Sequence, residues 1–423
     1  MKFVLANWGT RGEVEPFVAV GRELVRRGHD VRIAVAPEMV GFAESAGPAA
    51  VAYGPELRVI LEPHRDFWTS FFGNPWRIQE LNRLLGEVAG AFSQHRREVS
   101  ATLASLADGA DLLITGMNFE DVAANVAEYC EIPLATMHHF PLRANGQLLP
   151  LLPTPLGRSA MTAFEWLSWR GKRKVEDDAE RGEFGLPKAT GPWPGRIAER
   201  GSLEIQAYDE VCFPGLAAEW AKWDGQRPFV GALTMELPTT VDEEVLSWIA
   251  AGTPPICFGF GSVAVESAVD TLAMIGAACA QLGERALVCA AGTDYSKVPH
   301  FEHVKVVGAM HYAAVFPACR AVVHHGGAGT SNAGLRAGVP ALILWTLPDQ
   351  ALWAARVKRL KVGTGRRFST TTEKTLVADL HTILAPQYLT RARELAARMS
   401  KPAESVTAAA DLVENFARRK QAG

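Results

Sequence analysis

Residues 322–330 read Val-Val-His-His-Gly-Gly-Ala-Gly-Thr, an apolar run that passes through two histidines into a glycine-rich turn. The pattern predicts a buried strand, a tight turn and the start of a helix, which is the repeating unit of an α/β fold. Glycine lets the backbone approach a ligand closely, and the first N–H groups of a helix attract an anion. The turn therefore predicts a phosphate site to which His324 and the Thr330 hydroxyl add hydrogen bonds.

This turn has a simpler interpretation, in which glycine serves only the backbone geometry and His324 is an ordinary buried histidine. The paired histidines and the terminal threonine favour the ligand site. A second glycine motif, Gly-Phe-Gly-Ser-Val-Ala at residues 259–264, fits the dinucleotide fingerprint G-x-G-x-x-G/A. The acidic residue that this fingerprint needs after the next strand is absent, because residues 289–292 read Cys-Ala-Ala-Gly. We therefore expect Ser262 to face the same ligand, and we rank a dehydrogenase last.

The chain has 423 residues, more than one hydrophobic core ordinarily serves, so two domains are expected. Hydrophobic residues make up 48% and charged residues 21%, as in ordinary globular proteins. The net charge of −3, without a clustered basic excess, argues against nucleic acid as a partner.

The six cysteines are scattered without a C-x-x-C pair, which is typical of reduced, buried thiols. The apolar run near the N-terminus spans only residues 3–6, too short for a signal peptide. No stretch approaches the roughly 18 apolar residues of a membrane span. We expect a cytoplasmic protein, with peripheral contact at the inner face of the membrane left open. The sequence gives no indication of the oligomeric state.

Apolar strands alternate with helical stretches along the chain, which predicts parallel sheets covered on both faces. The pattern restarts near residue 256, so we expect two doubly wound α/β domains. Pro16 is expected in the first turn of the first helix, where proline is tolerated. The strands are expected at residues 3–6, 31–36, 111–115, 132–137, 256–260, 286–290, 304–307, 321–324 and 341–344.

The expected domains are residues 1–215 and 239–400, joined by a proline-containing linker at residues 216–238. The final segment, residues 401–423, carries an apolar helical stripe and is expected to dock back on the first domain.

Polar side chains also follow the strand at residues 341–344, at a strand end where α/β proteins bind ligands. Here a carboxylate, Asp349, stands beside an amide, Gln350, and the pair can hold several sugar hydroxyls. Asp349 alone would also fit a helix N-cap, an interpretation that leaves Gln350 unexplained.

Glu13 follows the first strand and is the candidate general base for an acceptor hydroxyl. The alternative is that Glu13 only neutralises the positive end of the first helix. His138 and His139, which follow the strand at residues 132–137, are the next candidates. The sequence has no D-x-D metal-binding pair, so we expect chemistry without a metal or other cofactor.

Two aromatic-rich segments, residues 67–76 and 148–169, fall outside the strand–helix alternation. They predict a surface that binds an apolar ligand, although ordinary core packing explains them about equally well. The basic run at residues 170–174 and the acidic residues that follow are expected to form a solvated helix face. The candidates for apolar binding are Trp8, Trp68, Phe72, Trp76, His138 and Trp166.

In order and spacing, the turn at residues 9–16, the run at 324–330 and residues 348–350 resemble the nucleotide-sugar-dependent glycosyltransferases of family one, which have the GT-B fold. The likeness extends over nearly the whole chain. It is strongest toward bacterial enzymes that glycosylate lipophilic natural products, such as vancomycin-type glycopeptides, sterols and the glycopeptidolipids of mycobacterial envelopes.

The resemblance implies a role for each motif. Met310 and His311 would lie against the nucleotide base, and Asp349 and Gln350 would hold the donor sugar. Where plant relatives carry a catalytic histidine and many bacterial relatives an aspartate, this chain has Glu13. The plant partner aspartate corresponds to Gly116, so no His–Asp dyad is expected. The residues implied to hold the donor diphosphate are His324, Gly327, Ala328, Gly329 and Thr330.

We therefore expect an inverting, metal-independent hexosyltransferase. A UDP- or dTDP-linked sugar would bind the second domain, a lipophilic acceptor would bind the first, and the reaction would take place in the cleft between them. A nucleotide-sugar epimerase of the same fold would need no apolar surface. A non-catalytic homologue would not need a complete donor turn.

Overall fold

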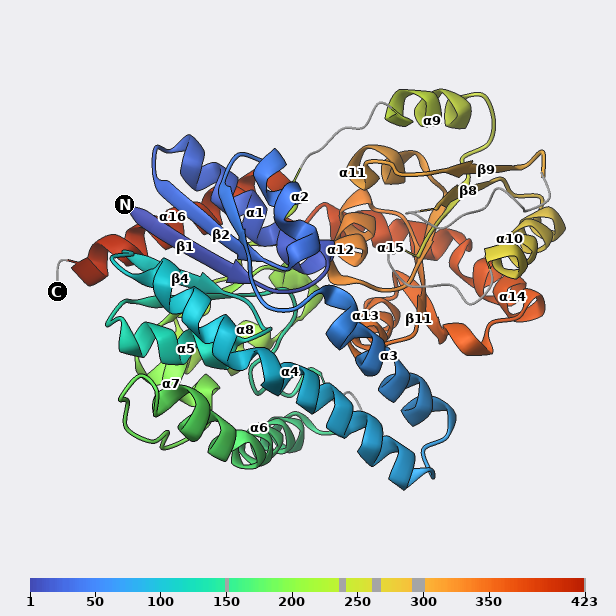
Figure 1. Ribbon diagram of the computed structural model, residues 1–423. Helices are drawn as coiled ribbons and strands as arrows, with labels where there is room; N and C mark the ends of the chain where they lie inside the picture. The colour runs from blue at the N-terminus through green and yellow to red at the C-terminus, as the bar shows by residue number, and fades with distance from the viewer. Residues whose placement is uncertain (149–151, 236–240, 261–267, 291–300, 422–423) are drawn as a thin grey trace. The chain divides into compact units, whose positions relative to one another are not determined.

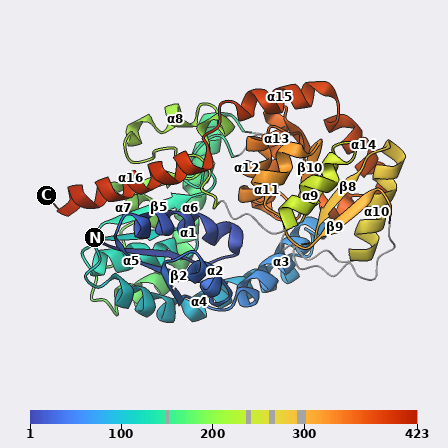
Figure 2. The ribbon, with the colours of Figure 1, turned by 90° about the horizontal axis from the view of Figure 1, so that it is seen from above.

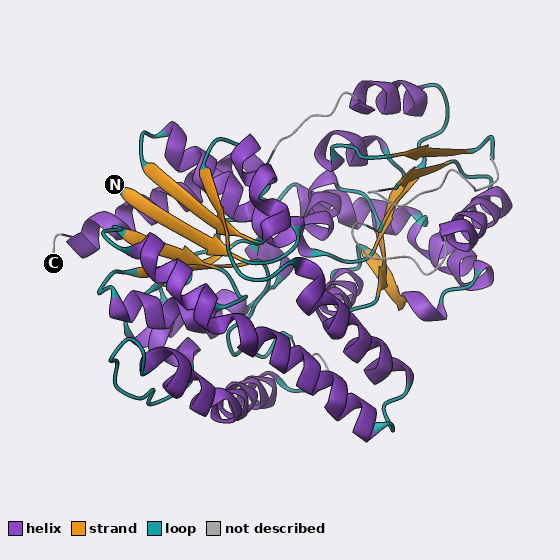
Figure 3. Ribbon diagram, in the orientation of Figure 1, coloured by secondary structure: helices purple, strands orange, loops and turns teal. Residues whose placement is uncertain are grey.

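The computed structural model describes residues 1–148, 152–235, 241–260, 268–290 and 301–421 (Figure 1). The chain forms two compact units, Met1–Met235 with Ser400–Gly423, and Glu236–Met399. Each unit consists of a β-sheet with helices packed on it (Figure 3). Ser262 and the rest of the second glycine motif beyond Phe260 lie outside the described residues.

The sheet of the first unit has six strands, all paired in parallel, in the order β3-β2-β1-β4-β5-β6. The central strands are buried almost throughout, as parallel strands covered on both faces must be. The strands are β1 (Lys2–Asn7), β2 (Asp30–Val35), β3 (Ala49–Ala52), β4 (Leu112–Thr115), β5 (Leu134–His138) and β6 (Leu203–Gln206).

The second unit repeats this order as β12-β11-β10-β7-β8-β9, again with parallel pairs. The doubly wound α/β fold expected from the sequence is confirmed in both units. The strand pattern did not predict β3, β6 or β12. The strands are β7 (Ile256–Gly259), β8 (Ala286–Cys289), β9 (Val304–Val307), β10 (Ala321–His324), β11 (Ala341–Trp345) and β12 (Gly363–Arg367).

Helices cover the sheet of the first unit, and one core cluster joins Val99 and Leu103 of α4 and Val122 of α5 to Val4 and Leu113 of the sheet. Both helices bury an apolar stripe, which is what holds a surface helix on a sheet. The helices are α1 (Arg11–Arg26), α2 (Val40–Ser45), α3 (Leu57–Gly73), α4 (Ile78–Ala107), α5 (Glu120–Tyr129), α6 (Thr154–Glu176), α7 (Trp193–Glu199), α8 (Leu216–Glu219) and α16 (Pro402–Gln421).

α1 begins earlier than expected, so Pro16 lies inside the helix and not in its first turn. The helix starts at Arg11 because the Glu13 carboxylate accepts the Thr10 N–H at 2.7 Å, which satisfies an otherwise free donor. Proline inside the helix removes the bond to the Gly12 carbonyl, but Gly12 is exposed and water can replace that bond.

The C-terminal helix α16 belongs to the first unit and packs along α1 (Figures 1 and 2). Val413 and Phe416 are buried, and Arg27 of α1 pairs with Asp411 at 2.7 Å and Glu414 at 2.8 Å. Most of the stretch expected to be a linker also lies in the first unit, which extends to Met235 and includes α8.

The sheet of the second unit is buried on both faces by separate apolar clusters. One cluster holds Leu376 and Leu380 of α14 against Phe258, and the other holds Val245 of α9 against Leu287. The helices are α9 (Val241–Ala250), α10 (Ala268–Leu282), α11 (Tyr312–Val315), α12 (Ala328–Ala337), α13 (Pro348–Arg359), α14 (Glu373–Ile383) and α15 (Pro386–Ala396).

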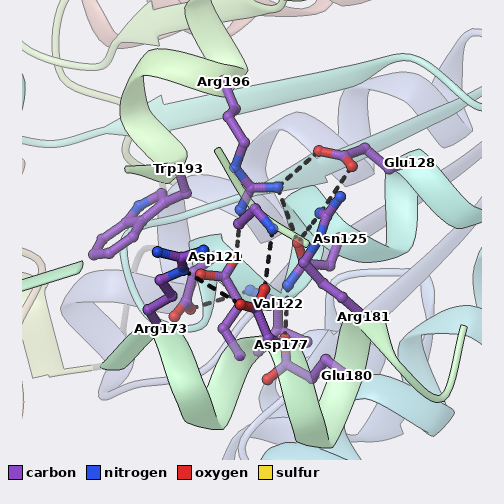
Figure 4. Close-up of polar contacts among 12 residues, drawn as sticks. Asp121, Val122, Asn125, Glu128, Arg173, Asp177, Glu180, Arg181, Trp193 and Arg196 are labelled. Atoms are coloured by element: carbon purple, nitrogen blue, oxygen red, sulfur yellow. Dashed lines mark hydrogen bonds and ion pairs between the residues drawn. The ribbon is translucent and has the colours of Figure 1, made fainter. Parts of the chain in front are cut away.

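A buried cluster of charged and amide side chains joins the helices beside the first sheet (Figure 4). Arg181 and Arg196 bind the Glu128 carboxylate at 2.8 and 2.9 Å, and Arg181 also donates to Asn125 at 2.8 Å. Arg196 further pairs with Glu176 at the end of α6, which is only 4% exposed. The expectation of a solvated face is therefore wrong for this acid, because buried arginines provide its partners.

Arg96 of α4 extends the cluster, since it pairs with Asp121 at 2.9 Å and with the fully buried Glu180. Arg96→Met should lower the free energy of unfolding by about 3–5 kcal/mol, because it strips a buried carboxylate of its arginine. Arg97→Met is the matched control, since Arg97 pairs with Glu183 where the side chains are 72% and 42% exposed. It should cost little. Urea denaturation of both variants checks this, and equal losses would show that the buried pairs carry no special weight.

Candidate active site

The strand order reverses between β1 and β4 in the first unit and between β7 and β10 in the second. In doubly wound sheets, the loops at the carboxyl ends of such strands diverge and leave room for a ligand. Glu13 follows β1, and the glycine-rich turn follows β10. Both predicted sites therefore lie where this kind of sheet binds ligands.

His324 ends β10 and is 1% exposed. Its Nδ1 accepts the N–H of Gly326 at 3.0 Å, so the proton of the neutral ring lies on Nε2. Burial, with a smaller effect of His325, lowers the pKa of His324 to about 3 and keeps the ring neutral. Among the described residues, the buried Nε2 has no hydrogen-bond partner. A buried donor of this kind is satisfied by a ligand or by water.

α12 starts beside this ring, with Gly327 as its N-cap. The first helical bond runs from the Ser331 N–H to the Gly327 carbonyl at 2.9 Å. The N–H groups of Ala328, Gly329 and Thr330 make no hydrogen bond within the described part of the chain. Three free donors at the positive end of a helix bind an anion such as phosphate.

The three glycines of the turn differ in what surrounds them. Gly326 has a φ of +96°, and a Cβ there would lie 2.6 Å from Cγ2 of Ile343. A Cβ at Gly327 would lie 2.6 Å from Nε2 of His325. At Gly329, apart from its chain neighbours and its own helix backbone, no atom of the described residues lies within 4 Å of the Cβ position. Folding therefore requires the first two glycines, whereas the third leaves open space at the free N–H groups.

The turn after β11 places Asp349 and Gln350 differently from the expectation. Gln350 is 4% exposed, and its Oε1 accepts the N–H groups of Thr346 at 2.8 Å and Leu347 at 3.1 Å. Gln350 thus caps α13, the role that the sequence suggested for Asp349. Asp349 is the second residue of α13 and is half-buried, and burial raises the pKa of its carboxyl above the ordinary value.

The loop after β9 holds the two residues expected at the nucleotide base, Met310 and His311, and only His311 is partly exposed. Met310 is 8% exposed and packs in the core cluster with Val307 and Phe316, so in the loop Gly308–His311 its side chain faces the core. An apolar side chain next to the sheet gains more from the core than from a polar loop. His311 is half-buried, and its backbone N–H donates to Asp242 at 2.8 Å.

The Glu13 carboxylate is held from two sides. Oε2 accepts the Thr10 N–H at 2.7 Å, which is the contact that a purely helix-capping role requires. Oε1 accepts Nδ2 of Asn118 at 3.1 Å, and the same Nδ2 donates to the Trp8 carbonyl at 2.8 Å. The sequence analysis did not single out Asn118, although its place just after β4, next to β1 in the sheet, points to it.

Gly116 shows why no aspartate partner is found after β4. A Cβ at Gly116 would lie 2.3 Å from Oδ1 of Asn7, so a larger residue has no room. The Asn7 amide in turn donates to the Glu13 carbonyl at 2.7 Å. Two asparagines therefore hold Glu13, Asn7 at its backbone carbonyl and Asn118 at its carboxylate.

Two of the candidates for apolar binding are core residues. Trp8 is 1% exposed, packs edge-on against Phe119, and donates its indole N–H to the Pro55 carbonyl at 2.7 Å. His138 is also 1% exposed, and its Nε2 contacts Glu120 at 2.8 Å. Both side chains are enclosed and lie away from any exposed surface, although the buried Nδ1 of His138 has no hydrogen-bond partner among the described residues.

The remaining aromatic candidates lie on α3, in the turn that follows it, and on α6. On α3, Trp68 stacks on Phe72 with ring centres 5.5 Å apart, and its indole N–H donates to His64 at 3.0 Å. Trp76, in the turn between α3 and α4, is 71% exposed. Trp166 of α6 is 44% exposed. These side chains are accessible, in contrast to Trp8 and His138.

Solved structures share this architecture over the whole chain. The calicheamicin glycosyltransferase CalG4 superposes with a TM-score of 0.71 at 17% identity and 99% coverage of both chains. The glycosyltransferase VinC, solved with dTDP, gives a TM-score of 0.66 at 20% identity over 99% of this chain and 100% of that one. The expected GT-B fold is confirmed.

Two family models also match: the glycosyltransferase family 28 N-terminal domain over residues 3–101, and the erythromycin biosynthesis protein CIII-like C-terminal domain over residues 269–414. An uncharacterized glycosyltransferase of Mycobacterium tuberculosis is 58% identical over 99% of this chain and 100% of its own length. The chain belongs to the GT-B glycosyltransferases. The chain also shares 26% identity with a sterol 3-beta-glucosyltransferase of Arabidopsis thaliana. That match covers 97% of this chain and 67% of the plant protein.

Within the described residues of the glycosyltransferase, no three histidine, cysteine, aspartate or glutamate side chains gather in a way that would hold a metal ion. In the same part of the chain, no helix has the length and apolar character needed to cross a membrane.

The buried histidine of the donor turn should make stability depend on pH. The pKa of His324 is about 3 in the folded chain and near 6.5 in the unfolded chain, so below pH 6.5 the unfolded chain binds the extra proton. Stability is complete above pH 6.5 and falls as the pH drops. Between pH 7 and pH 5, the free energy of unfolding of His324→Gln should therefore fall by about 2 kcal/mol less than that of wild type.

Urea denaturation at the two pH values measures this difference, with His381→Gln, at an exposed position, as the control. If His324→Gln and wild type lost the same stability on acidification, His324 would not be the buried neutral ring described above.

Proposed function

We propose that this glycosyltransferase moves a sugar, without a metal ion, from a UDP- or dTDP-linked donor to a hydroxyl of a lipophilic natural product or glycolipid, such as a glycopeptidolipid, with inversion at the anomeric carbon. VinC and the Streptomyces glycosyltransferase SsfS6 were solved with thymidine diphosphate. The sterol and calicheamicin glycosyltransferases among its relatives act on lipophilic or natural-product acceptors by name.

The proposal that a nucleotide sugar binds the second unit rests on the unsatisfied N–H groups after β10. The Nε2–H of His324 and the N–H groups of Ala328, Gly329 and Thr330 are free within the described chain. A nucleoside diphosphate supplies several anionic oxygens to satisfy them, and no cation is required to balance its charge at a helix N-terminus. The half-buried carboxylate of Asp349 and the Gln350 amide are the proposed contacts for the sugar, and His311 for the base.

In the proposed reaction, the acceptor oxygen displaces the nucleoside diphosphate from the sugar in a single step. The acceptor oxygen forms a bond to the anomeric carbon as the bond from that carbon to the diphosphate breaks, so the configuration inverts. The proton of the hydroxyl passes to the Glu13 carboxylate, and negative charge grows on the leaving diphosphate at the start of α12. Asn118 is proposed to position Glu13, because it donates to Oε1, the carboxylate oxygen other than the one that accepts the Thr10 N–H.

The acceptor is proposed to use the accessible aromatics of the first unit, above all Trp68, Phe72 and Trp76. Burial lowers the pKa of the half-buried His139 to about 4, so its ring is neutral. We keep Glu13 as the base, because it follows β1 at the strand end where such sheets bind ligands and Asn118 holds its carboxylate.

The proposed activity is tested by incubating the chain with UDP- and dTDP-sugars and a panel of sterol, macrolide and glycolipid acceptors. Glycosylated product with inverted configuration, formed equally with and without EDTA, supports the proposal. Product that forms only with magnesium or manganese overturns metal independence, and failure of every nucleotide sugar to bind overturns the donor half.

Thr330→Val should weaken dTDP or UDP binding by about 1–2 kcal/mol, because it removes a hydroxyl donor but keeps the shape of the side chain. Gly329→Ala should not lower the melting temperature, since no side chain of the described residues lies near the added methyl and alanine favours the helix, but it should weaken nucleotide binding by crowding the free N–H groups. Titration calorimetry measures both. Unchanged affinity in both variants would place the diphosphate elsewhere.

Glu13→Gln should lower kcat roughly 10²–10⁴-fold while dTDP affinity and melting temperature hold, because glutamine still caps α1 but cannot take a proton. Asn118→Ala should lower kcat less and move the acid limb of the pH–kcat profile to higher pH, because a lost hydrogen bond disfavours the carboxylate. A Glu13→Gln enzyme with wild-type kcat would assign the base to another group. An unmoved pH limb in Asn118→Ala would leave Asn118 a structural residue.

A further inference from the structure

The outer face of α6 is apolar. Leu156, Phe164 and Leu167 are 58%, 72% and 63% exposed and recur at helical spacing, so they form one stripe. Trp169 and Glu176, on the opposite side, are 5% and 4% exposed. A helix that packs on a globular core normally shows the reverse arrangement. Figure 1 places this helix at the lower edge of the first unit.

Positive charge lies next to this stripe. α6 carries five cations and two acids. The cations are exposed, and Arg170, Lys172 and Lys174 continue the helix beyond Leu167. Neither acid is exposed: Glu176 is buried and pairs with Arg196, and Glu165 is half-buried. The exposed surface of the helix is thus apolar and cationic, with its negative charges removed to the interior.

Aromatic side chains lie at the border between these two zones. Trp166 is 44% exposed, and the guanidinium of Arg170 lies 5.0 Å from the centre of its ring. Tryptophan beside arginine suits the boundary between lipid headgroups and acyl chains, where an apolar ring and a cation both find partners.

We propose that the outer face of α6 is a docking surface for a membrane rich in anionic lipids. Leu156, Phe164 and Leu167 would enter the headgroup boundary, and the cations that follow would contact anionic headgroups. A second copy of this chain fits less well, because an antiparallel twofold pairing of α6 on its apolar stripe would bring Lys174 toward Arg158 of the other copy, with no exposed acid on the helix to pair with them. This inference concerns the first unit alone and stands whether or not the proposed donor is correct.

The test is flotation of the full chain with vesicles of phosphatidylcholine alone or with about one third phosphatidylglycerol. Wild type should float with the anionic vesicles at low salt, and far less with neutral vesicles or at high salt. Phe164→Ser/Leu167→Ser and Arg170→Gln/Lys174→Gln should each reduce the bound fraction at least tenfold at the same lipid concentration, because Arg170 and Lys174 share the face of the stripe. Both doubles replace exposed side chains, so melting temperatures should stay at the wild-type value.

Leu85→Ser is the matched control for Leu167→Ser, since Leu85 is 52% exposed on another long helix, α4. It should float like wild type. The proposal is overturned if wild type stays with neither vesicle, or if the α6 variants float normally. It is also overturned if light scattering shows that wild type is a dimer which Phe164→Ser/Leu167→Ser converts to a monomer while vesicle binding persists.

Discussion

Parallel pairing of β10 with β7 on one side and β11 on the other is the constraint on which the donor site depends. The register places Val323 opposite Phe258 and Leu342, which fixes the height at which the strand ends. Because all neighbours are parallel, the chain must leave the sheet edge through a turn and return as a helix. The first N–H groups of that helix cannot be satisfied within it, and the sheet holds them beside a buried histidine.

Buried glutamates of the first unit are paired with arginines, whereas a buried histidine N–H in the second unit has no partner in the described chain. In the first unit, buried carboxylates are neutralised by arginine, as Glu180 is by Arg96 and Glu120 is by Arg143. At the end of β10, burial instead keeps His324 uncharged and leaves Nε2 without a partner in the described chain. Paired buried charges fix helices to one another, whereas an unpaired buried donor beside free helical N–H groups marks a place for a ligand.

Much of the fold could be predicted because apolar strands alternate regularly with helices. β12 was missed because its sequence, Gly-Thr-Gly-Arg-Arg, resembles a turn. Its glycines are required by packing, since a Cβ at Gly363 would lie 2.1 Å from the Ala341 carbonyl oxygen. The sequence does not reveal such a close approach between strands.

For the site residues, the sequence predicted the backbone positions but not the directions of the side chains. The strand–turn–helix pattern at residues 321–330 correctly predicted that His324 ends a strand and that Thr330 lies in the first turn of the next helix. The roles of Trp8, Met310 and Gln350 depended on which way each side chain faces, and local sequence does not determine this. The inner face of α6 shows the same limit, because Glu176 is buried by an arginine that lies 20 residues further along the chain.

The most direct test of the central claim is a crystal structure of this chain with dTDP or UDP. The account predicts the diphosphate against the N–H groups of Ala328, Gly329 and Thr330, with one oxygen within hydrogen-bond distance of Nε2 of His324. A diphosphate bound elsewhere, or one held through a metal ion with Nε2 of His324 still unsatisfied, would contradict it.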